Sequence, residues 1–542
     1  MSATNPTASG SIAITSREPL PTGSASSQGA ASLFSGSESP LPSRRDFLKV
    51  GSVLSGAVLL PEAATIHAAL TADSATNSFP MIGVGVVQLF VDYDRVDAVQ
   101  NIQRIFHSVE KHPENPVIRK VEPWETERGT WGSIIYDQEE KIFKAWYGGD
   151  SGRQKESIPG SLSPCHVLCY ATSHDGVHWD RPRLGMYEAF GTKENNVVIG
   201  DDRLNGHCHW ESLHKDPFDP NPERRYKAIG WSSYDWNGPM SGIYSMSSRN
   251  GLLWNLSPAP IVHFHPRPGT NDLGPIGDAQ SIMVDTLKKR YVAFLRRSPN
   301  RVFSVSKDFV TWTPPAISMK PRDGGSLYNH MGFVYGDHYL GQLSYLNQSD
   351  NTNTVMDVWL ITSRDGEVWE RLDTGKPLIG LGEIGEWDRY NLRLTGAPPI
   401  RVGNKLYFYY RHTANRHTPY IGKDTTDQAG GLGLATLRLD GFASVAAGFD
   451  GGQLTTKPFR FAGDELQVNA KADFGQLTVE VLDEMGQPLP GFTGDACLPM
   501  SADRVEQPIR WKESKSLAQF KDRPICLRFH LKNVQLYAYR IV

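Results

Sequence analysis

Short apolar runs separated by turn residues fill the chain from about residue 131 to residue 450. Runs of this kind lie at residues 133–136, 167–171, 291–295 and 358–362. Gly, Pro, Asn and Asp cluster between the runs, as they do between strands, and no sustained period of 3.6 residues interrupts them. The pattern predicts an all-β structure with many turns.

One phrase recurs where several of these runs end: a serine, one variable residue, an acidic or amide residue, three more residues and a tryptophan. The third position is Asp175, Asn250, Asp308 or Asp365, and an eroded copy without the tryptophan contains Asp440. Successive copies lie 75, 58, 57 and 75 residues apart. Self-similarity at such intervals indicates an array of similar units.

Each phrase has the composition of a hairpin end. Asp-Gly or Asn-Gly, present in all copies but the third, supplies the residues with positive φ that tight turns need. The tryptophan then opens the returning strand and offers a large apolar surface to the next unit. We interpret the repeated Ser, Asp and Trp as scaffold, because catalysis occurs once and not in every unit. Five such units predict a five-bladed β-propeller.

The repeat stops near Gly451, and residues 455–542 contain new short apolar runs at 477–482, 525–531 and 534–541. We interpret this part as a separate β-sandwich. The expected division is a leader at residues 1–70, the propeller at 80–450 and the sandwich at 452–542. Residues 71–120 form a lead-in, whose amphipathic stretch at 96–109 is compatible with a short helix.

The first 70 residues predict location rather than fold. Residues 2–42 are rich in Ser, Ala, Gly and Pro and are typical of a disordered segment. Arg44 and Arg45 precede an apolar stretch at 50–60 and small residues up to Ala69, which is the pattern of a twin-arginine export signal cleaved near Ala68 or Ala69. Eleven residues are too few to cross a bilayer, which takes about 20. We expect a periplasmic or secreted protein without a permanent membrane span.

The net charge and the cysteine spacing limit the classes of ligand that the protein is expected to bind. The net charge is −3 and no long basic stripe is present, so nucleic acid is not an expected partner. The five cysteines form no CxxC pair, and their spacing does not indicate zinc. In an exported chain Cys497 and Cys526 could form a disulfide or remain buried thiols, and the sequence leaves both open.

Several stretches resemble a known enzyme superfamily. They are Asn115-Pro-Val through Trp124-Glu125, Phe143-Lys-Ala-Trp-Tyr-Gly148, Tyr170-Ala-Thr-Ser-His-Asp-Gly176 with Trp179, Asn195-Asn-Val-Val, Gly385-Glu-Trp-Asp388, Phe408-Tyr-Tyr-Arg411 and Leu454-Thr-Thr-Lys-Pro-Phe-Arg-Phe461. With five blades and a sandwich, the chain resembles the five-bladed propeller glycosidases of glycoside hydrolase families 32 and 43, and most of all exported proteins described as family 32-like. The resemblance covers about residues 80–542 and implies hydrolysis of a glycosidic bond.

The chain departs from family 32 in its signature motifs. It lacks the Asn-Asp-Pro-Asn-Gly nucleophile motif and the Arg-Asp-Pro and Glu-Cys signatures. The resemblance therefore implies no invertase or fructanase activity, and candidate catalytic residues must be chosen by their positions.

Candidate catalytic carboxylates precede the first strand of four blades, where a propeller directs side chains into its central funnel. They are Glu125, Glu211, Asp278 and Asp388. Glycosidic cleavage uses two carboxyl groups, about 5–5.5 Å apart in retaining enzymes and about 6.5–9.5 Å apart in inverting ones. We expect Glu211 to act as the acid and Glu125 or Asp278 as the base or nucleophile. Asp388 would hold substrate hydroxyls or tune a pKa.

Neighbouring side chains are candidates for substrate binding. They are Trp124, His209, Trp210, Asn329, His330, Trp387, Arg411 and His412. The tryptophans could stack on sugar faces, and the histidines and Asn329 could bind hydroxyl groups. Arg411 could bind a carboxylate or sulfate of an acidic sugar, or form a structural ion pair. No metal or cofactor site is predicted, although a structural calcium ion in the funnel is left open.

Taken together, these features predict an exported glycoside hydrolase that cleaves a poly- or oligosaccharide with paired carboxylates in a propeller funnel. Two other classes stay open: a carbohydrate-binding propeller without catalysis, and a polysaccharide lyase in which His and Tyr side chains would do the work.

Overall fold

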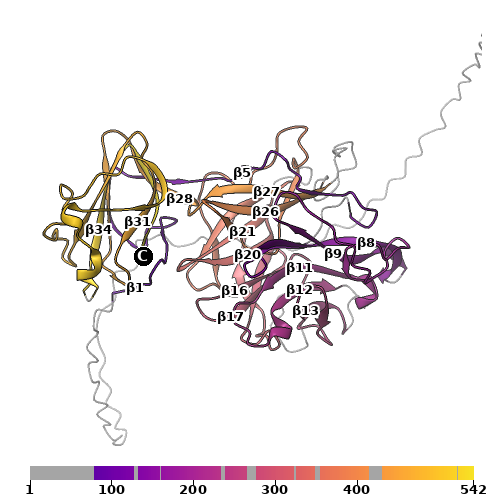
Figure 1. Ribbon diagram of the computed structural model, residues 1–542. Helices are drawn as coiled ribbons and strands as arrows, with labels where there is room; N and C mark the ends of the chain where they lie inside the picture. The colour runs from indigo at the N-terminus through magenta and orange to yellow at the C-terminus, as the bar shows by residue number, and fades with distance from the viewer. Residues whose placement is uncertain are drawn as a thin grey trace, which may run out of the picture. The chain divides into compact units, whose positions relative to one another are not determined.

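The computed structural model describes residues 79–126, 132–158, 160–232, 239–264, 276–322, 325–347, 354–413, 430–521 and 523–542. Within these ranges the chain is built of strands, and its helices are four short 3-10 turns (Figure 1). The turns are η1 (Arg203–Gly206), η2 (Pro222–Arg224), η3 (Lys512–Ser514) and η4 (Leu517–Phe520). The all-β prediction is confirmed. The leader and its twin arginines lie outside the described residues, and none of the described helices has the length and apolarity needed to cross a membrane.

Five groups of antiparallel strands follow one another along the chain, and the last two groups belong to a single ten-stranded sheet. The first contains β7 (Gly132–Asp137), β8 (Ile142–Ile158), β9 (Ser161–Ser173) and β10 (Val197–Ile199). The second contains β11 (Cys208–Lys215), β12 (Tyr226–Ser232), β13 (Gly242–Ser248), β14 (Trp254–Leu256) and β15 (Val262–His263). The third contains β16 (Ser281–Asp285), β17 (Arg290–Arg297), β18 (Asn300–Ser306) and β19 (Ala316–Met319).

The fourth and fifth groups are joined by one parallel bridge between Met356 and Asn391. The fourth contains β20 (Ser326–Tyr335), β21 (His338–Leu346), β22 (Met356–Ser363) and β23 (Trp369–Arg371). The fifth contains β24 (Asn391–Leu394), β25 (Ile400–Val402), β26 (Lys405–Thr413) and β27 (Gly431–Arg438). Its outer edge is completed by β5 (Glu110–Lys111) and β6 (Ile118–Arg119), which come from the N-terminal part of the chain and pair with β27.

Buried serine hydroxyls join the first strands of these groups. The Ser133 hydroxyl of β7 accepts from the amide of Leu213 in β11 at 2.8 Å. The Ser212 hydroxyl of β11 accepts from Ile282 of β16 at 2.9 Å, and Ser281 of β16 donates to the carbonyl of His330 in β20. The circuit closes where Gly396, just after β24, donates to the carbonyl of Gly132 at 2.7 Å. We refer to the five groups as blades, and their arrangement as a five-bladed propeller stays a prediction.

The recurring Ser-x-Asp/Asn phrase forms the same turn four times. In the first copy the Asp175 carboxylate accepts from the amides of Val177 and His178, both at 2.8 Å, while the Ser173 hydroxyl accepts from the amide of Gly176 at 2.8 Å. The copies built on Asn250, Asp308 and Asp365 repeat these bonds within 0.2 Å. The scaffold interpretation of the phrase is confirmed.

The eroded fifth copy has a different task. Asp440 has a positive φ of 60° and accepts from the Tyr335 hydroxyl at 2.7 Å. Its other carboxylate oxygen lies 2.5 Å from Arg540 of the C-terminal strand β35 (Val534–Ile541). Here the hairpin aspartate binds a side chain of the C-terminal domain in place of capping its own turn.

The C-terminal domain is a sandwich of two main sheets. One has the strand order β33-β31-β35-β28-β4, with β2 added beside β35, and the other has the order β3-β29-β34-β32. Their bounds are β2 (Gln88–Leu89), β3 (Val96–Gln100), β4 (Gln103–Phe106), β28 (Ala443–Ala447), β29 (Gly452–Thr456), β31 (Leu466–Lys471), β32 (Gln476–Leu482), β33 (Asp503–Pro508) and β34 (Cys526–Lys532). A parallel pair, β1 (Met81–Ile82) with β30 (Arg460–Phe461), adds a small third sheet.

The expectation of a helix at 96–109 is wrong, because β3 and β4 occupy this stretch and pair with β29 and β28. Residues from the lead-in thus belong to the sandwich sheets. The expected boundaries at 80, 450 and 452 stay predictions, although the pairing of β2–β4 and β28 places these strands in the sandwich.

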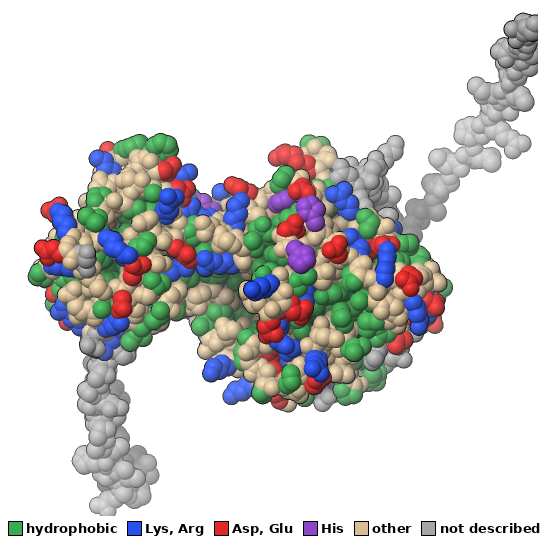
Figure 2. All heavy atoms as spheres, in the orientation of Figure 1, with side chains coloured by type: hydrophobic (Ala, Val, Ile, Leu, Met, Phe, Trp, Pro, Cys, Tyr) green, Lys and Arg blue, Asp and Glu red, His purple; other side chains and the backbone are tan. Residues whose placement is uncertain are grey.

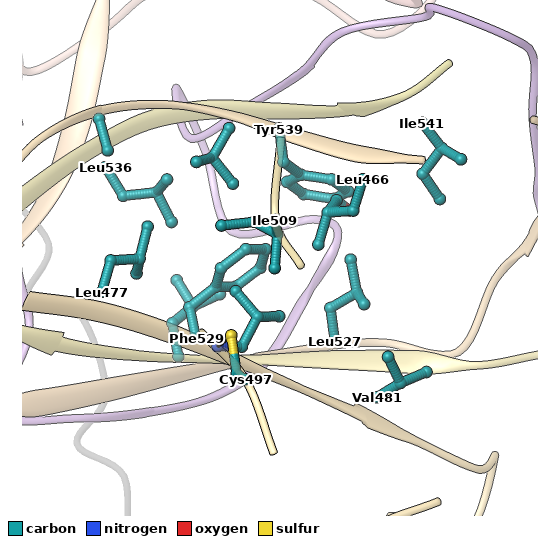
Figure 3. Close-up of a cluster of buried hydrophobic side chains, with 14 of the residues drawn as sticks. Leu466, Leu477, Val481, Cys497, Ile509, Leu527, Phe529, Leu536, Tyr539 and Ile541 are labelled. Atoms are coloured by element: carbon teal, nitrogen blue, oxygen red, sulfur yellow. Dashed lines mark hydrogen bonds between the residues drawn. The ribbon is translucent and has the colours of Figure 1, made fainter. Parts of the chain in front are cut away.

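Aliphatic and aromatic side chains fill the space between the two sandwich sheets (Figure 3). Leu466, Leu477, Leu527, Phe529 and Leu536 are at most 1% exposed. Cys497 lies in this cluster as a free thiol, and Cys526 is also buried and free. Of the two alternatives for this pair, the structure has the thiols.

Two glycines with positive φ support one test of the blade packing. At Gly251, where φ is 75°, an added methyl group would lie 2.5 Å from the Trp146 ring, whereas Gly375, with φ of 71°, faces open space. Both alanine substitutions carry the strain of a left-handed residue. We expect Gly251→Ala to lower the free energy of unfolding by about 1–3 kcal/mol more than Gly375→Ala, because only the first overpacks a core. Urea denaturation measures the difference, and equal losses would contradict this packing.

Candidate active site

Glu211 enters the site from a bulge in the innermost strand of the second blade. Trp210 pairs with Gly230 and Ser212 with Ile229, so Glu211 is the extra residue of β11. Bulges redirect side chains and are frequent beside active sites. The Glu211 side chain is buried, and its carboxyl group accepts from the backbone amides of Ala279, at 3.1 Å, and of Gln280.

These two amides belong to the turn that carries Asp278. Ala279 has a φ of 76°, which is strained for a residue with a Cβ. Glu211 holds the amides of this turn, and Arg301 donates to the Ala279 carbonyl at 2.7 Å. The Asp278 side chain is 29% exposed, so it is the solvent-facing member of the pair. The structure therefore places Glu211 and Asp278 side by side.

The two carboxyl groups differ in their protonation. Burial, with a further contribution from the charge of Asp278, raises the pKa of Glu211 to about 8. Burial would also raise the pKa of Asp278, but Arg296 and Arg393 outweigh it and hold that pKa below its usual range. At neutral pH Glu211 carries a proton and Asp278 is ionised. Two carboxyl groups with opposed pKa shifts are the usual arrangement of an acid and a base.

Tyr328 and three arginines surround this pair. The Tyr328 hydroxyl donates to Asp278 at 3.0 Å, and Arg296 lies 2.5 Å from the other oxygen of Asp278. Tyr328 is the extra residue of a second bulge, in the innermost strand β20. Burial and the nearby Arg393 hold the pKa of the Arg411 guanidinium well below its usual value, although the two carboxyl groups act in the opposite direction.

His209 lies near the Glu211–Asp278 pair, on the same strand as Glu211. Its ring centroid lies 4.1 Å from that of His166 in the neighbouring blade. Burial and His166 hold the pKa of His209 well below its usual value, so the imidazole is neutral at pH 7. A neutral imidazole can donate or accept a hydrogen bond from a sugar hydroxyl.

Glu125 is engaged elsewhere. One of its oxygens accepts from the Tyr147 hydroxyl at 2.7 Å and from Arg181 at 2.5 Å. The other accepts from the amides of Val121 and Glu122 at 2.8 and 3.1 Å. With four donors on a side chain that is 3% exposed, this carboxylate stabilises its own turn. The structure does not bring it to the Glu211–Asp278 pair.

Asp388 and its neighbours form a separate buried cluster in the fifth blade. Asp388 lies 2.6 Å from Lys111 of β5 and accepts from the Tyr410 hydroxyl at 2.8 Å. Trp387 stacks on Tyr410, with ring centroids 5.8 Å apart, and contacts His412 edge-on. Burial, with Lys111 nearby, lowers the pKa of His412 to about 3. This ion pair ties the N-terminal strand β5 to the blade that it completes.

The remaining predicted binding residues are mostly core residues. Trp124 is 3% exposed and donates to Asn196 at 2.7 Å, while Trp210 is 7% exposed within the apolar cluster between the first two blades. His330 stacks on Phe294 with a centroid distance of 4.0 Å. Asn329 is also buried, 4% exposed. None of these side chains offers an open surface for sugar stacking.

Sequence reasoning missed Arg296, Tyr328 and Arg393. Arg393 could have been found from the alternation of side chains along a strand. It lies two residues after Asn391, the first residue of β24, so both side chains lie on the same face of the strand. Tyr328 could not be found in this way, because a bulge interrupts the alternation at its position.

Among the described residues, no three His, Cys, Asp or Glu side chains gather as metal ligands. The charged groups in the site are the carboxyl pair and the guanidinium groups. On the face shown in Figure 2, acidic and basic side chains are interspersed.

No protein-family model and no curated protein matches this sequence. Solved structures do match. One is a glycosyl hydrolase from Bacteroides ovatus, 17% identical, with a TM-score of 0.43 over 61% of this chain and 94% of the other. Another is an N-acetylgalactosamine deacetylase from F. plautii in complex with blood group B trisaccharide, 16% identical, with a TM-score of 0.40 over 62% and 97%. A third is a beta-1,2-mannobiose phosphorylase from Listeria innocua, 12% identical, with a TM-score of 0.36 over 61% and 97%. At these scores the likeness carries no argument about activity.

The raised pKa of Glu211 has a consequence for stability. The unfolded chain loses this proton near pH 4.5, whereas the folded protein keeps it to about pH 8. Between these values the folded state binds more protons, so its stability falls as pH rises, by up to about 1.4 kcal/mol per pH unit. We expect Glu211→Gln to flatten the dependence of the unfolding free energy on pH between 5 and 8. Denaturant titrations at several pH values measure this, and parallel curves for the two proteins would contradict the burial of a neutral Glu211.

Proposed function

We propose that this protein is a glycoside hydrolase in which Glu211 is the general acid and Asp278 is the base or nucleophile. The observation that carries the proposal is a protonated, buried carboxyl group near an ionised, partly exposed one. Glu211 accepts from the amide of the residue that follows Asp278, and the charge of Asp278 helps to raise the pKa of Glu211. This is the pair of groups that cleavage of a glycosidic bond requires. The proposal keeps the predicted roles of Glu211 and Asp278 and omits Glu125 and Asp388 from the chemistry.

In this scheme Glu211 gives its proton to the oxygen that leaves with the departing sugar. Asp278 either attacks the anomeric carbon or takes a proton from the attacking water. The Asp278 charge favours the proton on Glu211 before the reaction, and Arg296 keeps Asp278 ionised until it attacks the sugar or takes the proton. His209 and Tyr328, whose hydroxyl donates to Asp278, would bind hydroxyl groups of the sugar.

A polysaccharide lyase is the second candidate, favoured by a specific observation. Tyr328 and the neutral His209 lie beside several guanidinium groups, and elimination from an acidic sugar uses a proton acceptor next to cations that neutralise the sugar carboxylate. A propeller that binds carbohydrate without turnover is the third. The predicted export through a twin-arginine signal to the periplasm or the medium is part of the same proposal and agrees with an extracellular glycan as substrate.

The test uses the mature protein, aryl glycosides and a panel of polysaccharides. We expect hydrolysis, with kcat reduced about 10²–10⁴-fold in Glu211→Gln and in Asp278→Asn. Asp450→Asn, a change of an exposed carboxylate, is the matched control. The loss in Glu211→Gln should be smaller for nitrophenyl leaving groups than for sugar leaving groups, because a nitrophenolate needs less protonation. Wild-type activity should fall as pH rises through about 8.

Three outcomes would reject the proposal. Full activity in Asp278→Asn would remove the carboxyl pair from the chemistry. Products that absorb in the ultraviolet, as unsaturated sugars do, would establish the lyase. Glycan binding without any product would leave the binding propeller.

A further inference from the structure

The first blade carries a hairpin that is longer than its counterparts. β8 and β9 have 17 and 13 residues (Figure 1), whereas the corresponding strands of the other blades have 7 to 9. β7 pairs with β8 only as far as Tyr147, and beyond this residue β8 and β9 continue to pair with each other. Three residues into this extension, Asp150 lies opposite His166 of β9. The extra length therefore carries His166 beyond the first strand of its blade.

Side-chain hydrogen bonds hold the extension against the segment that leads into β11. The Ser151 hydroxyl donates to the Asp201 carboxylate at 2.8 Å, and the Lys155 ammonium group donates to the Asp201 carbonyl at 3.0 Å. His207, the last residue before β11, donates from its ring to the carbonyl of Glu156 at 3.2 Å. The extension is thus tied to the start of the strand that carries the proposed acid.

His166 contacts His209, the second residue of β11. The ring centroids lie 4.1 Å apart, and the ring planes are inclined at 42°. Within its own blade His209 is the direct cross-strand partner of Trp231, whose ring stacks on it with a centroid distance of 6.0 Å. The last torsion of a histidine side chain has broad preferences of its own, so neighbouring rings decide the plane of the imidazole. Rings from two blades have this effect on His209.

The protonation of the two histidines permits this close contact. Burial lowers the pKa of His166, and His207 acts in the same direction, although the Asp150 carboxylate opposes them. Burial and His166 together hold the pKa of His209 well below its usual value. Both imidazoles are therefore neutral at pH 7, and no charge repulsion separates them.

The plane of the His209 ring matters because of its neighbours. His209 and Asp278 each contribute to the pKa of the other, so the imidazole lies within electrostatic reach of the carboxyl pair. A neutral imidazole has one donor nitrogen and one acceptor nitrogen, both in the plane of the ring. The direction of that plane therefore decides which hydroxyl group of a bound sugar the ring can reach.

We propose that His166 is a positioning residue of the sugar site: it fixes the His209 imidazole so that a ring nitrogen binds one hydroxyl group of the sugar beside Glu211 and Asp278. This inference rests on the proposed function and gives the long hairpin of the first blade a part in substrate recognition. His166 acts through His209 and takes no part in bond cleavage.

Kinetics of single and double variants test the coupling of the two histidines. The substrates are the nitrophenyl glycoside that the wild-type protein hydrolyses fastest and its deoxy analogues, each of which lacks one hydroxyl group. We expect His209→Ala to raise KM about three- to tenfold and to change kcat less than about twofold, because one hydrogen bond to the bound sugar is lost. In this variant the penalty for removing one particular hydroxyl group should disappear, which identifies the group that His209 binds.

The positioning role predicts a dependent effect at His166. His166→Ala should raise KM by a similar factor, reduce the penalty for the same hydroxyl group, and have little further effect in the His209→Ala background. His166→Phe, which keeps a ring beside His209, should restore most of the wild-type KM. His174→Ala, the same change at an exposed position just after β9, is the matched control and should leave KM unchanged. His166→Gln, which keeps more side-chain volume, replaces His166→Ala if the latter does not fold.

Several results would overturn the inference. They are a wild-type KM in His166→Ala or in His209→Ala, additive effects of these two substitutions, and a KM in His166→Phe as high as in His166→Ala. If any of these occurs while the wild-type protein hydrolyses the glycoside, the proposed function is retained and only this inference is rejected. A wild-type protein that hydrolyses none of the glycosides would reject the proposed function and this inference together.

Discussion

The hydrogen bonds of the buried serines between neighbouring blades fix the geometry on which the site depends. A hydroxyl without a partner in this interior would be costly, so each serine sets the distance and register of the strand beside it. Ser133, Ser212 and Ser281 lie in the first strands of three successive blades. The bulged Glu211 is next to Ser212, and the Asp278 turn leads directly into Ser281. The catalytic proposal is therefore a consequence of how the blades are held together.

The site itself combines irregular backbone with opposed electrostatics. Both Glu211 and Tyr328 occupy bulges, and Ala279 has a left-handed conformation held by Glu211 and Arg301. Such features cost stability and persist where surrounding structure determines them. Here they bring a buried, uncharged carboxyl group near a partly exposed, ionised one, in a site with few acidic and several basic groups. The same arrangement favours proton transfer.

The sequence predicted the parts of the fold that a repeated motif encodes. It did not predict which side chains meet at the site, because that depends on the direction of each side chain on its strand. The hairpin phrase predicted the turns and the all-β class, because each copy uses the same local bonds. Trp210 lies in the apolar cluster between the first two blades, whereas Glu211 next to it is redirected by a bulge that the sequence did not indicate. The prediction that Trp124 and Glu125 line the site was also not met, because both side chains are buried. Residues of β3 escaped detection because their exposed side chains leave no alternating pattern. Charges such as Arg393 become meaningful only after distant blades are brought together.

Some N-terminal strands pair with the fifth blade and others with the sandwich, and this pairing determines the order in which the parts can fold. Glu110 of β5 pairs with Thr436, and Ser444 of β28 pairs with Ile105 of β4. These early segments have no partner until nearly the whole polypeptide has left the ribosome. Closing such long loops is slow for entropic reasons. A nascent chain would thus hold its first strands unpaired, and the fifth blade and the sandwich would be completed almost together, as the last step of assembly.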